Sequence, residues 1–378
     1  MGQDIAAEVR AVPFFDPRPT FKGLEPAILA DFAELLESGM FVNGPQVARF
    51  EEAFAGYCGV AHCVGVASGL DALRLALLAA GIEPGDEVIA PAHTFVATLE
   101  AISQVGGQPV LVDVREADGN IDPAAVESAI TPRTRALLPV HLYGQLADMV
   151  ALRAIAERHG VVVIEDAAQA HGASRDGHRP GSSALAAAFS FYPAKNLGAF
   201  GDAGACVTGD ERLATRVRSL REHGQPRRYE HEEIGYTARL DTIQAVALAH
   251  KLPLLDGWIV ERRAIARAYS EALADVGDLR LPSVPEGSDP VWHLYVVRTS
   301  QPERLAARLS ERGVDTGRHY PHPVHLTGAY AGLGYRQRDF PVAEAIAAEG
   351  LSLPIFPGMS EEQVAAVIEA VTAAFERR

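Results

Sequence analysis

Residues 189–204 of the chain read FSFYPAKNLGAFGDAG, a stretch that places Lys195 among apolar and small residues shortly after the hydroxyl of Ser190. Lysine is scarce in this chain, which contains only Lys22, Lys195 and Lys251. Arginine supplies nearly all of its positive charge. A desolvated lysine amine can lose its proton near neutral pH and attack a carbonyl, whereas a guanidinium group stays charged. We therefore interpret Lys195 as a candidate nucleophilic amine, with an ordinary lysine on a solvent-facing loop as the alternative.

Composition and charge are typical of a globular protein. The 378 residues are 48% hydrophobic and 22% charged, enough for two domains or for one large domain with a smaller appendage. The formal net charge of −15 argues against a nucleic-acid or anionic-membrane partner. Cys58, Cys63 and Cys206 lack the paired spacing of metal ligands and are interpreted as reduced thiols of a cytoplasmic protein. Residues 1–10 carry acids without an apolar core, which argues against a signal peptide, and no apolar run of about 18 residues predicts a membrane span.

Short apolar strands alternate with helices along most of the chain. Strands are predicted at 62–67, 87–92, 109–114, 134–141 and 161–164, and helices at 24–38, 46–57, from 68 onward, 95–105, 123–130, 147–159, 211–222 and 240–275, the last interrupted at Pro253. This pattern indicates an α/β protein with a mostly parallel sheet, whose ligands bind beyond the carboxyl ends of the strands. His93, Asp166 and Ser190 lie at such strand ends, so we expect them to converge.

The C-terminal part predicts a second, smaller domain. Residues 11–20 are expected to form an extended arm, and the proline-rich piece 281–290 leads into predicted strands at 291–298 and 314–320 and helices at 302–312 and 361–376. We therefore assign residues 1–250 to a large domain that includes the arm and residues 251–378 to a small domain.

One group of residues suits a phosphate. Ser68 and Gly69 open a predicted helix directly after a strand, and the free amides of a helix start bind anions. Ser190 supplies a further hydroxyl. The alternative is that Ser68 serves only as a helix N-cap.

The other requirements of pyridoxal 5′-phosphate are met further along the chain. Phe95 offers an aromatic face to the pyridine ring, and Asp166, which closes an apolar strand, can keep the ring nitrogen protonated. Lys195 provides the amine for the cofactor aldehyde. Together with the phosphate group of residues, these side chains predict pyridoxal 5′-phosphate as the cofactor.

On these residues the chain resembles the DegT/DnrJ/EryC1/StrS family of fold type I pyridoxal-phosphate aminotransferases, which act on nucleotide-linked keto sugars. The resemblance spans nearly the whole chain and is carried most specifically by IEDAAQAHG at 164–172 and SFYPAKNLG at 190–198. It implies a large domain with a mostly parallel, mixed seven-stranded sheet flanked by helices, and a smaller C-terminal α+β domain.

The resemblance also implies roles for individual residues. Lys195 would be the Schiff-base lysine and proton carrier, Asp166 would meet the ring nitrogen and Gln169 would lie near the ring hydroxyl. The remaining implied contacts are the phosphate with Ser68, Gly69 and Ser190, and the ring face with Phe95. A homodimer with shared sites and glutamate as amino donor are implied as well.

Two departures from the family pattern bear on the prediction. Thr237 stands where relatives commonly carry an asparagine that reaches the phosphate across the dimer interface, and Leu70 stands where many carry threonine. The resulting SGLDAL at 68–73 resembles the branch of the family that aminates the sugar at C3. This resemblance implies that the substrate is a deoxy-keto-hexose linked to dTDP. Lys195 favours transamination, because relatives with histidine there are dehydratases; a dehydratase or regulatory homologue is the alternative.

Three residues are candidate substrate contacts. His319 and Tyr320 lie in a stretch that the resemblance places near the sugar nucleotide, with a packing role as the alternative, and Arg239 suits a diphosphate or a donor carboxylate, with a salt bridge as the alternative. His319, His322 and His325 do not predict a metal site, because prolines between them exclude a helix that would align them. A nicotinamide-dependent dehydrogenase is disfavoured because no Gly-x-Gly-x-x-Gly follows an early strand.

Overall fold

A computed structural model describes residues 11–376 of the chain. Two segments lie outside the described residues, namely 1–10 and 377–378. The first of them is the segment whose acids argue against a signal peptide. The helices are α1 Glu25–Ser38, α2 Pro45–Cys58, α3 Gly69–Ala79, α4 Ala97–Gln104, α5 Pro123–Ala129, α6 Met149–His159, α7 Glu211–Arg221, α8 Thr242–Lys251, α9 Leu255–Ala272, α10 Pro302–Ser310, α11 Pro341–Glu349 and α12 Glu361–Phe375. The strands are β1 His62–Val66, β2 Glu87–Pro91, β3 Gln108–Val112, β4 Thr134–Leu137, β5 Val162–Asp166, β6 Ser174–Arg175, β7 Ala186–Ser190, β8 Gly204–Thr208, β9 Ser288–Asp289, β10 Tyr295–Arg298 and β11 Gly350–Leu353.

The central element is a seven-stranded sheet in the order β1-β8-β7-β5-β4-β2-β3. Strand β8 pairs antiparallel with both β1 and β7, and the other neighbours pair in parallel. The predicted fold class, a mostly parallel mixed sheet flanked by helices, is confirmed. The carboxyl ends of β5 and β7 therefore lie at the same edge of the sheet, as the sequence predicts for Asp166 and Ser190.

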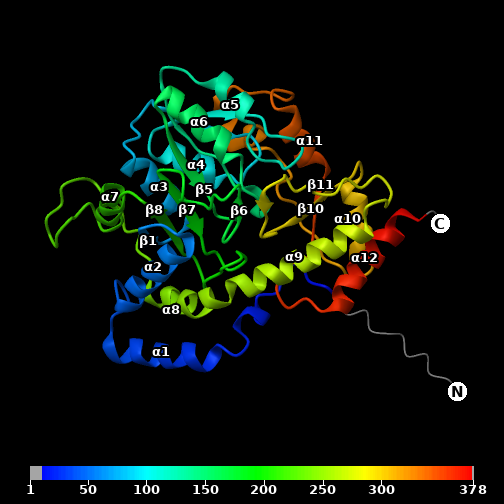
Figure 1. The fold of residues 1–378 in the computed structure, drawn as a ribbon, viewed down its shortest axis with the longest axis horizontal. Helices are drawn as coiled ribbons and strands as arrows, with labels where there is room; N and C mark the ends of the chain where they lie inside the picture. The colour runs from blue at the N-terminus through cyan, green and yellow to red at the C-terminus, as the bar shows by residue number, and fades with distance from the viewer. Residues whose placement is uncertain (1–10, 377–378) are drawn as a thin grey trace.

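Helices cover both faces of this sheet because its strands are apolar on both sides. In β7, Ala186 and Ala188 pack into a cluster with α3, α4 and α7, whereas Ala187 and Phe189 pack with α2 and α8 on the opposite face. Burial on both faces explains why these strands read as continuous apolar runs. Figure 1 shows α3 and α7 beside the sheet and α1 and α8 below it.

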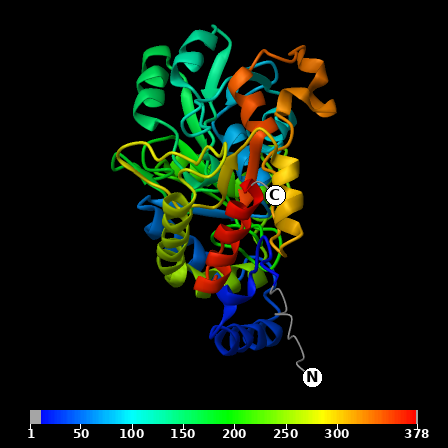
Figure 2. The same ribbon diagram turned by 90° about the vertical axis from the view of Figure 1, so that its right-hand side faces the viewer.

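A second hydrophobic cluster forms around the C-terminal elements. Strands β10 and β11 form a two-stranded antiparallel sheet against α9, α10 and α12, and Val12 of the N-terminal arm packs into the same cluster. Figure 2 shows α12 in red alongside α9. The proposed boundary at residue 250 stays a prediction; Pro253 lies in the short 3₁₀ turn Leu252–Leu254 that joins α8 to α9.

The predicted strand at 314–320 is wrong. Val314 bridges Val12, whereas Gly317 bridges Ser352, so the segment changes partner and never builds a continuous ladder. The predicted strand at 291–298 begins later than expected, at Tyr295. Among residues 11–376, no helix is both long and apolar enough to span a bilayer.

Candidate active site

Lys195 lies on the loop that connects β7 to β8, two adjacent strands of the central sheet. Ser190 pairs with Gly204 where the two strands meet the loop. The amide of Ala199 donates to the carbonyl of Phe191 at 2.8 Å, so the loop closes on itself around Lys195. The middle of the stretch 189–204 is therefore a closed loop that follows the carboxyl end of β7.

The backbone of this loop is tightly packed. A Cβ atom at Gly198 would lie 2.4 Å from the carbonyl oxygen of Pro193, closer than a side chain allows. The Asn196 side chain donates to the carbonyl of Val291 at 3.0 Å, and its Oδ1 lies 3.2 Å from Nδ1 of His293. The segment before β10 thus holds the loop from one side.

Asp166 ends β5 as a buried carboxylate with two oriented hydrogen bonds. Its Oδ2 accepts from the Thr98 hydroxyl at 2.8 Å, and its Oδ1 accepts from the amide of Ala168 at 3.1 Å. Burial raises the pKa of Asp166, and the Lys195 amine is among the groups that oppose this rise. Burial lowers the pKa of Lys195 to about 8, and the Asp166 carboxylate limits that decrease. The two side chains are therefore electrostatically coupled.

Ser68, Gly69 and Ser190 converge at the start of α3, as the sequence predicts. A Cβ atom at Gly69 would lie 2.6 Å from Cβ of Ser190, so only glycine permits this approach. Ser68 is also the N-cap, because its hydroxyl accepts from the amide of Asp71 at 3.0 Å. Ser68 therefore caps α3, as the alternative interpretation of the sequence expects. The first amides of α3 still point toward the place where Ser68, Gly69 and Ser190 meet.

Gln169 joins two aromatic residues on the opposite side of the site. Its Oε1 accepts from the amide of Tyr143 at 2.6 Å, and its Nε2 donates to the Tyr320 hydroxyl at 3.1 Å. The ring of Phe95, 52% exposed, lies 5.4 Å from the Tyr320 ring between centroids. The predicted residues Phe95, Gln169 and Tyr320 are thus brought together.

Neutral histidines surround Lys195. His171 contacts the carbonyl of Ser190 through Nε2 at 2.9 Å, and burial lowers its pKa to about 3. Burial also lowers the pKa of His293 and, to about 4, that of His319, with the charge of Lys195 acting in the same direction on both. His319 bonds the Ser352 hydroxyl at 2.8 Å and stacks on Phe14 at 5.5 Å, so it has packing partners as well as a place near the site.

Sequence reasoning missed several residues of this group. Thr98, Tyr143 and His293 support predicted site residues, yet nothing in their local sequence marks them out. Asn196 also supports the site and could have been found, because it lies within the distinctive segment 190–198. His171 could have been found, because it lies within the distinctive segment 164–172.

The side chains of Thr237 and Arg239 contact residues outside this group, although the backbone of Arg239 bridges Val66, two residues before Ser68. The Thr237 hydroxyl is 3.1 Å from Nε2 of His223, and Arg239 forms an ion pair with Glu222 at 2.8 Å. Glu222 also accepts from the Asn43 side chain at 3.0 Å. Arg239 therefore has the salt bridge that was considered as the alternative to substrate binding.

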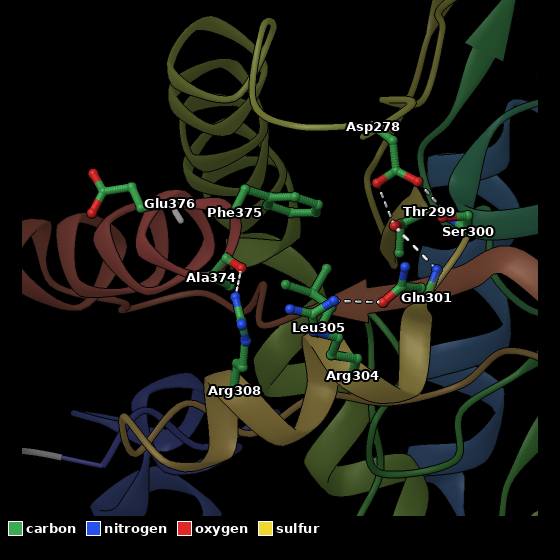
Figure 3. Close-up of a pocket in the computed structure, with 10 residues that line it drawn as sticks. All are labelled: Asp278, Thr299, Ser300, Gln301, Arg304, Leu305, Arg308, Ala374, Phe375 and Glu376. Atoms are coloured by element: carbon green, nitrogen blue, oxygen red, sulfur yellow. Dashed lines mark hydrogen bonds between the residues drawn. The ribbon is translucent and has the colours of Figure 1, made fainter. Parts of the chain in front are cut away.

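A surface cavity of about 640 Å³ lies elsewhere, between α10 and α12 (Figure 3). Several of its polar groups are already paired within the chain: Asp278 accepts from Thr299 and Ser300, and Arg304 donates to Gln301. None of the predicted site residues lines it. Across residues 11–376, no cluster of three or more His, Cys, Asp or Glu side chains is arranged to hold a metal ion.

The mixed α/β fold is that of solved aminotransferase structures, and the candidate site combines a lysine amine of lowered pKa with the start of a helix. The chain belongs to the DegT/DnrJ/EryC1/StrS aminotransferase family, whose match covers residues 23–372. The resemblance inferred from the sequence is therefore confirmed.

Individual relatives match the chain along almost its whole length. It is 50% identical to dTDP-3-amino-3,4,6-trideoxy-alpha-D-glucose transaminase of Streptomyces venezuelae over 371 residues, 98% of each chain. The crystal structure of S. venezuelae DesV in complex with a ketimine intermediate matches with a TM-score of 0.95 and 50% identity, covering 97% of this chain and 99% of that one. The structure of ntda from Bacillus subtilis with bound cofactor pmp matches with a TM-score of 0.91 and 32% identity, covering 97% of this chain and 86% of that one.

Proposed function

We propose that the chain is a pyridoxal-phosphate-dependent aminotransferase that delivers an amino group from glutamate to C3 of a dTDP-linked deoxy-keto-hexose in amino-sugar biosynthesis. The observation that carries the proposal is the electrostatic coupling of Lys195, whose pKa is lowered to about 8, with buried Asp166. Asp166 ends β5, and Lys195 lies on the loop that follows the adjacent strand β7. Family membership and the 50% identity to a dTDP-sugar transaminase support it.

The residues present fit the cofactor. Bound pyridoxal 5′-phosphate supplies an aldehyde that carries the amino group and a protonated ring that withdraws electrons. Asp166 would hold the ring nitrogen protonated, since Thr98 and Ala168 keep its carboxylate oriented. The phosphate would be bound by Ser68, Gly69 and Ser190, where the close backbone approach leaves the amides of α3 accessible.

Lys195 is proposed to bind the cofactor covalently and to move protons once displaced. A free amine with a pKa near 8 is partly neutral at physiological pH and can accept a proton, which an ordinary lysine rarely does. Phe95 would cover the ring face, Gln169 would contact the ring hydroxyl, and His319 and Tyr320 would contact the sugar nucleotide. Dehydratase relatives carry histidine at the position of Lys195. The lysine of this chain therefore favours amino transfer over the alternative, a dehydratase or a regulatory homologue.

We further propose a homodimer with shared active sites. Met40, Phe41, Val42, Phe200 and Ile243 are exposed, and we call these five residues the α1–α8 patch. Backbone amides connect its parts, because Thr242 donates to the Phe41 carbonyl and Phe200 donates to Gln244. Val42 bridges Asp241, so Thr237 and Arg239 lie in the segment that leads up to the patch. This placement suits Thr237 for the phosphate, and Arg239 for the substrate, of the partner's site. We also place the enzyme in the cytoplasm, and its cofactor domain in residues 1–250.

The first test replaces Lys195 with alanine. We expect Lys195→Ala to lose the borohydride-reducible link to pyridoxal phosphate and all amino transfer from glutamate, whereas the exposed-lysine control Lys22→Ala keeps both. Peptide mapping after reduction locates the link, and a panel of nucleotide-linked keto sugars tests the acceptor. If no amino donor aminates the bound cofactor of the unmodified protein, the transaminase proposal fails.

The second test mixes two inactive variants, Lys195→Ala and Arg239→Ala. If Arg239 serves the partner's site, each mixed dimer contains one unaltered site, and about a quarter of the activity returns on subunit exchange. An active monomer in sedimentation, or no recovery from fully exchanged dimers, would exclude shared sites.

A further inference from the structure

Lys251, the last residue of α8, is the second buried amine near the Lys195 loop. Its side chain is 2% exposed, and its Nζ donates to the carbonyl oxygen of Gly198 at 2.6 Å. That carbonyl belongs to the same closed loop as Lys195. Lys251 thus connects α8 directly to the segment that carries the proposed nucleophile.

The surroundings of this amine are unusual for a buried charge. Within residues 11–376, no carboxylate forms an ion pair with Lys251. Two aromatic rings flank it instead, with Nζ 4.3 Å from the centroid of Phe21 and 5.7 Å from that of Trp258. An unpaired buried ammonium is costly unless it is hydrogen-bonded, and cation–π contacts offset part of that cost. Among residues 11–376, the Gly198 carbonyl is therefore the polar group that this buried ammonium binds.

The same helix contacts the loop at a second point. Oε1 of Gln244 accepts from the amide of Phe200 at 2.8 Å. Gln244 and Lys251 lie two helical turns apart and so project from the same face of α8. On the other side, Asn196 is bonded to the segment before β10. The loop is therefore held between α8 and that segment, and Lys195 directly precedes the first attached residue, Asn196.

We propose that Lys251 is a positioning residue that holds the Gly198 carbonyl and thereby places the Lys195 amine for its covalent link to pyridoxal phosphate. The inference rests on the proposed role of Lys195. A compact ammonium suits this position, because a guanidinium is larger and planar and distributes its donors differently. This explains why a chain with three lysines, and arginine nearly everywhere else, places one of them here. Burial lowers the pKa of Lys251 to about 8, so the charged donor form predominates below that pH.

The test is a double-mutant cycle on cofactor binding by the full-length protein. Dissociation constants for pyridoxal phosphate are measured by equilibrium dialysis for the unmodified chain, Lys251→Met, Lys195→Ala and the double variant. Lys251→Met is expected to weaken binding about tenfold when Lys195 is present, because one charge-assisted hydrogen bond is lost. With Lys195→Ala, the same change is expected to alter binding by less than about twofold.

The outcomes separate the inference from the proposed function. Equal weakening in both backgrounds would mean that Lys251 only supports the fold or the phosphate site, and no weakening in either would exclude any role; both results overturn the inference. If Lys195→Ala keeps a borohydride-reducible link, the proposed role of Lys195 fails instead. Lys22→Met serves as the matched control, because Lys22 is exposed and its replacement should leave the dissociation constant unchanged.

A second variant covers the case in which Lys251→Met does not fold. Lys251→Arg keeps a cation and a donor at the end of α8, and thermal unfolding of the cofactor-free protein reports whether it folds. We expect a smaller loss of cofactor affinity that again requires Lys195. If Lys251→Arg folds and binds the cofactor as tightly as the unmodified chain, the proposed need for an ammonium at this position is wrong.

Discussion

At the scale of single residues, burial and one neighbouring charge decide the chemistry of Lys195. Burial disfavours the ammonium form and lowers the pKa to about 8, while the Asp166 carboxylate favours it. Buried His171 and His293 are kept neutral, so they add no positive charge that would lower this pKa further. The amine is thus held in a range where both protonation states are populated.

This balance predicts how Lys195 reacts in the cofactor-free protein. Its rate of acetylation by acetic anhydride should rise with pH, because only the neutral amine reacts, with a midpoint near 8. Asp166→Asn should move the midpoint to lower pH, since it removes the charge that favours the ammonium form. Mass spectrometry of the Lys195 peptide, with exposed Lys22 as internal reference, measures both; a midpoint that stays in place or rises in Asp166→Asn would contradict the coupling.

At the scale of elements, the strand ends and the start of α3 depend on close backbone approach. Gly69 contacts Ser190, and Gly204 lies so close to Ser68 that a Cβ atom would be 2.3 Å from the Ser68 carbonyl. The loop from β7 to β8 and the helix start therefore meet without intervening side chains. This contact brings the proposed phosphate site next to the Lys195 loop.

A single methyl group tests this contact. Gly69→Ala should lower the free energy of unfolding by about 1–3 kcal/mol through overpacking and should weaken cofactor binding by displacing Ser190. The control Gly56→Ala lies at an exposed position of helix α2 with nothing near the added atom, and should be neutral or stabilising by up to about 1 kcal/mol. Urea unfolding and equilibrium dialysis measure the two effects. Unchanged cofactor affinity in a folded Gly69→Ala protein would separate this glycine from the phosphate site.

At the scale of the whole molecule, the site is built from distant segments whose titratable groups share one buried region. His93, His171, His293 and His319 come from different parts of the chain, and burial lowers the pKa of each. In the unfolded chain, an imidazole has its ordinary pKa near 6.5. Between that value and about 4, the unfolded state therefore binds more protons than the folded state, and stability falls as the pH falls.

The predicted acid sensitivity can be assigned to a residue. The free energy of unfolding at fixed protein concentration should fall between pH 6.5 and 5, above the range in which most carboxylates titrate. His171→Gln should make that slope shallower by about 1 kcal/mol per pH unit, because its imidazole no longer takes up a proton on unfolding. The exposed-histidine control His231→Gln should leave the slope nearly unchanged. An unaltered slope in His171→Gln would contradict burial of the neutral ring.

The sequence predicted most of the elements that precede and follow the site. Helix α2, strand β1 and strand β2 differ by a residue or so from their predicted bounds, because apolar periodicity and terminating glycines mark them locally. Strand β8 was not assigned, and segment 314–320 was misassigned. Both errors concern segments that pair with distant parts of the chain, β8 with β1 and segment 314–320 with Val12 and Ser352, and local patterns do not encode such pairing.

For residues 189–204, too, some properties follow from the sequence and others only from the tertiary structure. The sequence by itself determined the fold class, the family and a scarce lysine in a distinctive motif, because residue type and order are sufficient for those inferences. The tertiary structure alone decided that the Asp166 carboxylate acts on the pKa of this amine and that Lys251 holds Gly198. It also decided that the side chains of Thr237 and Arg239 contact His223 and Glu222 within one chain. The physical reason is that burial, desolvation and hydrogen-bond partners arise only when distant segments pack together.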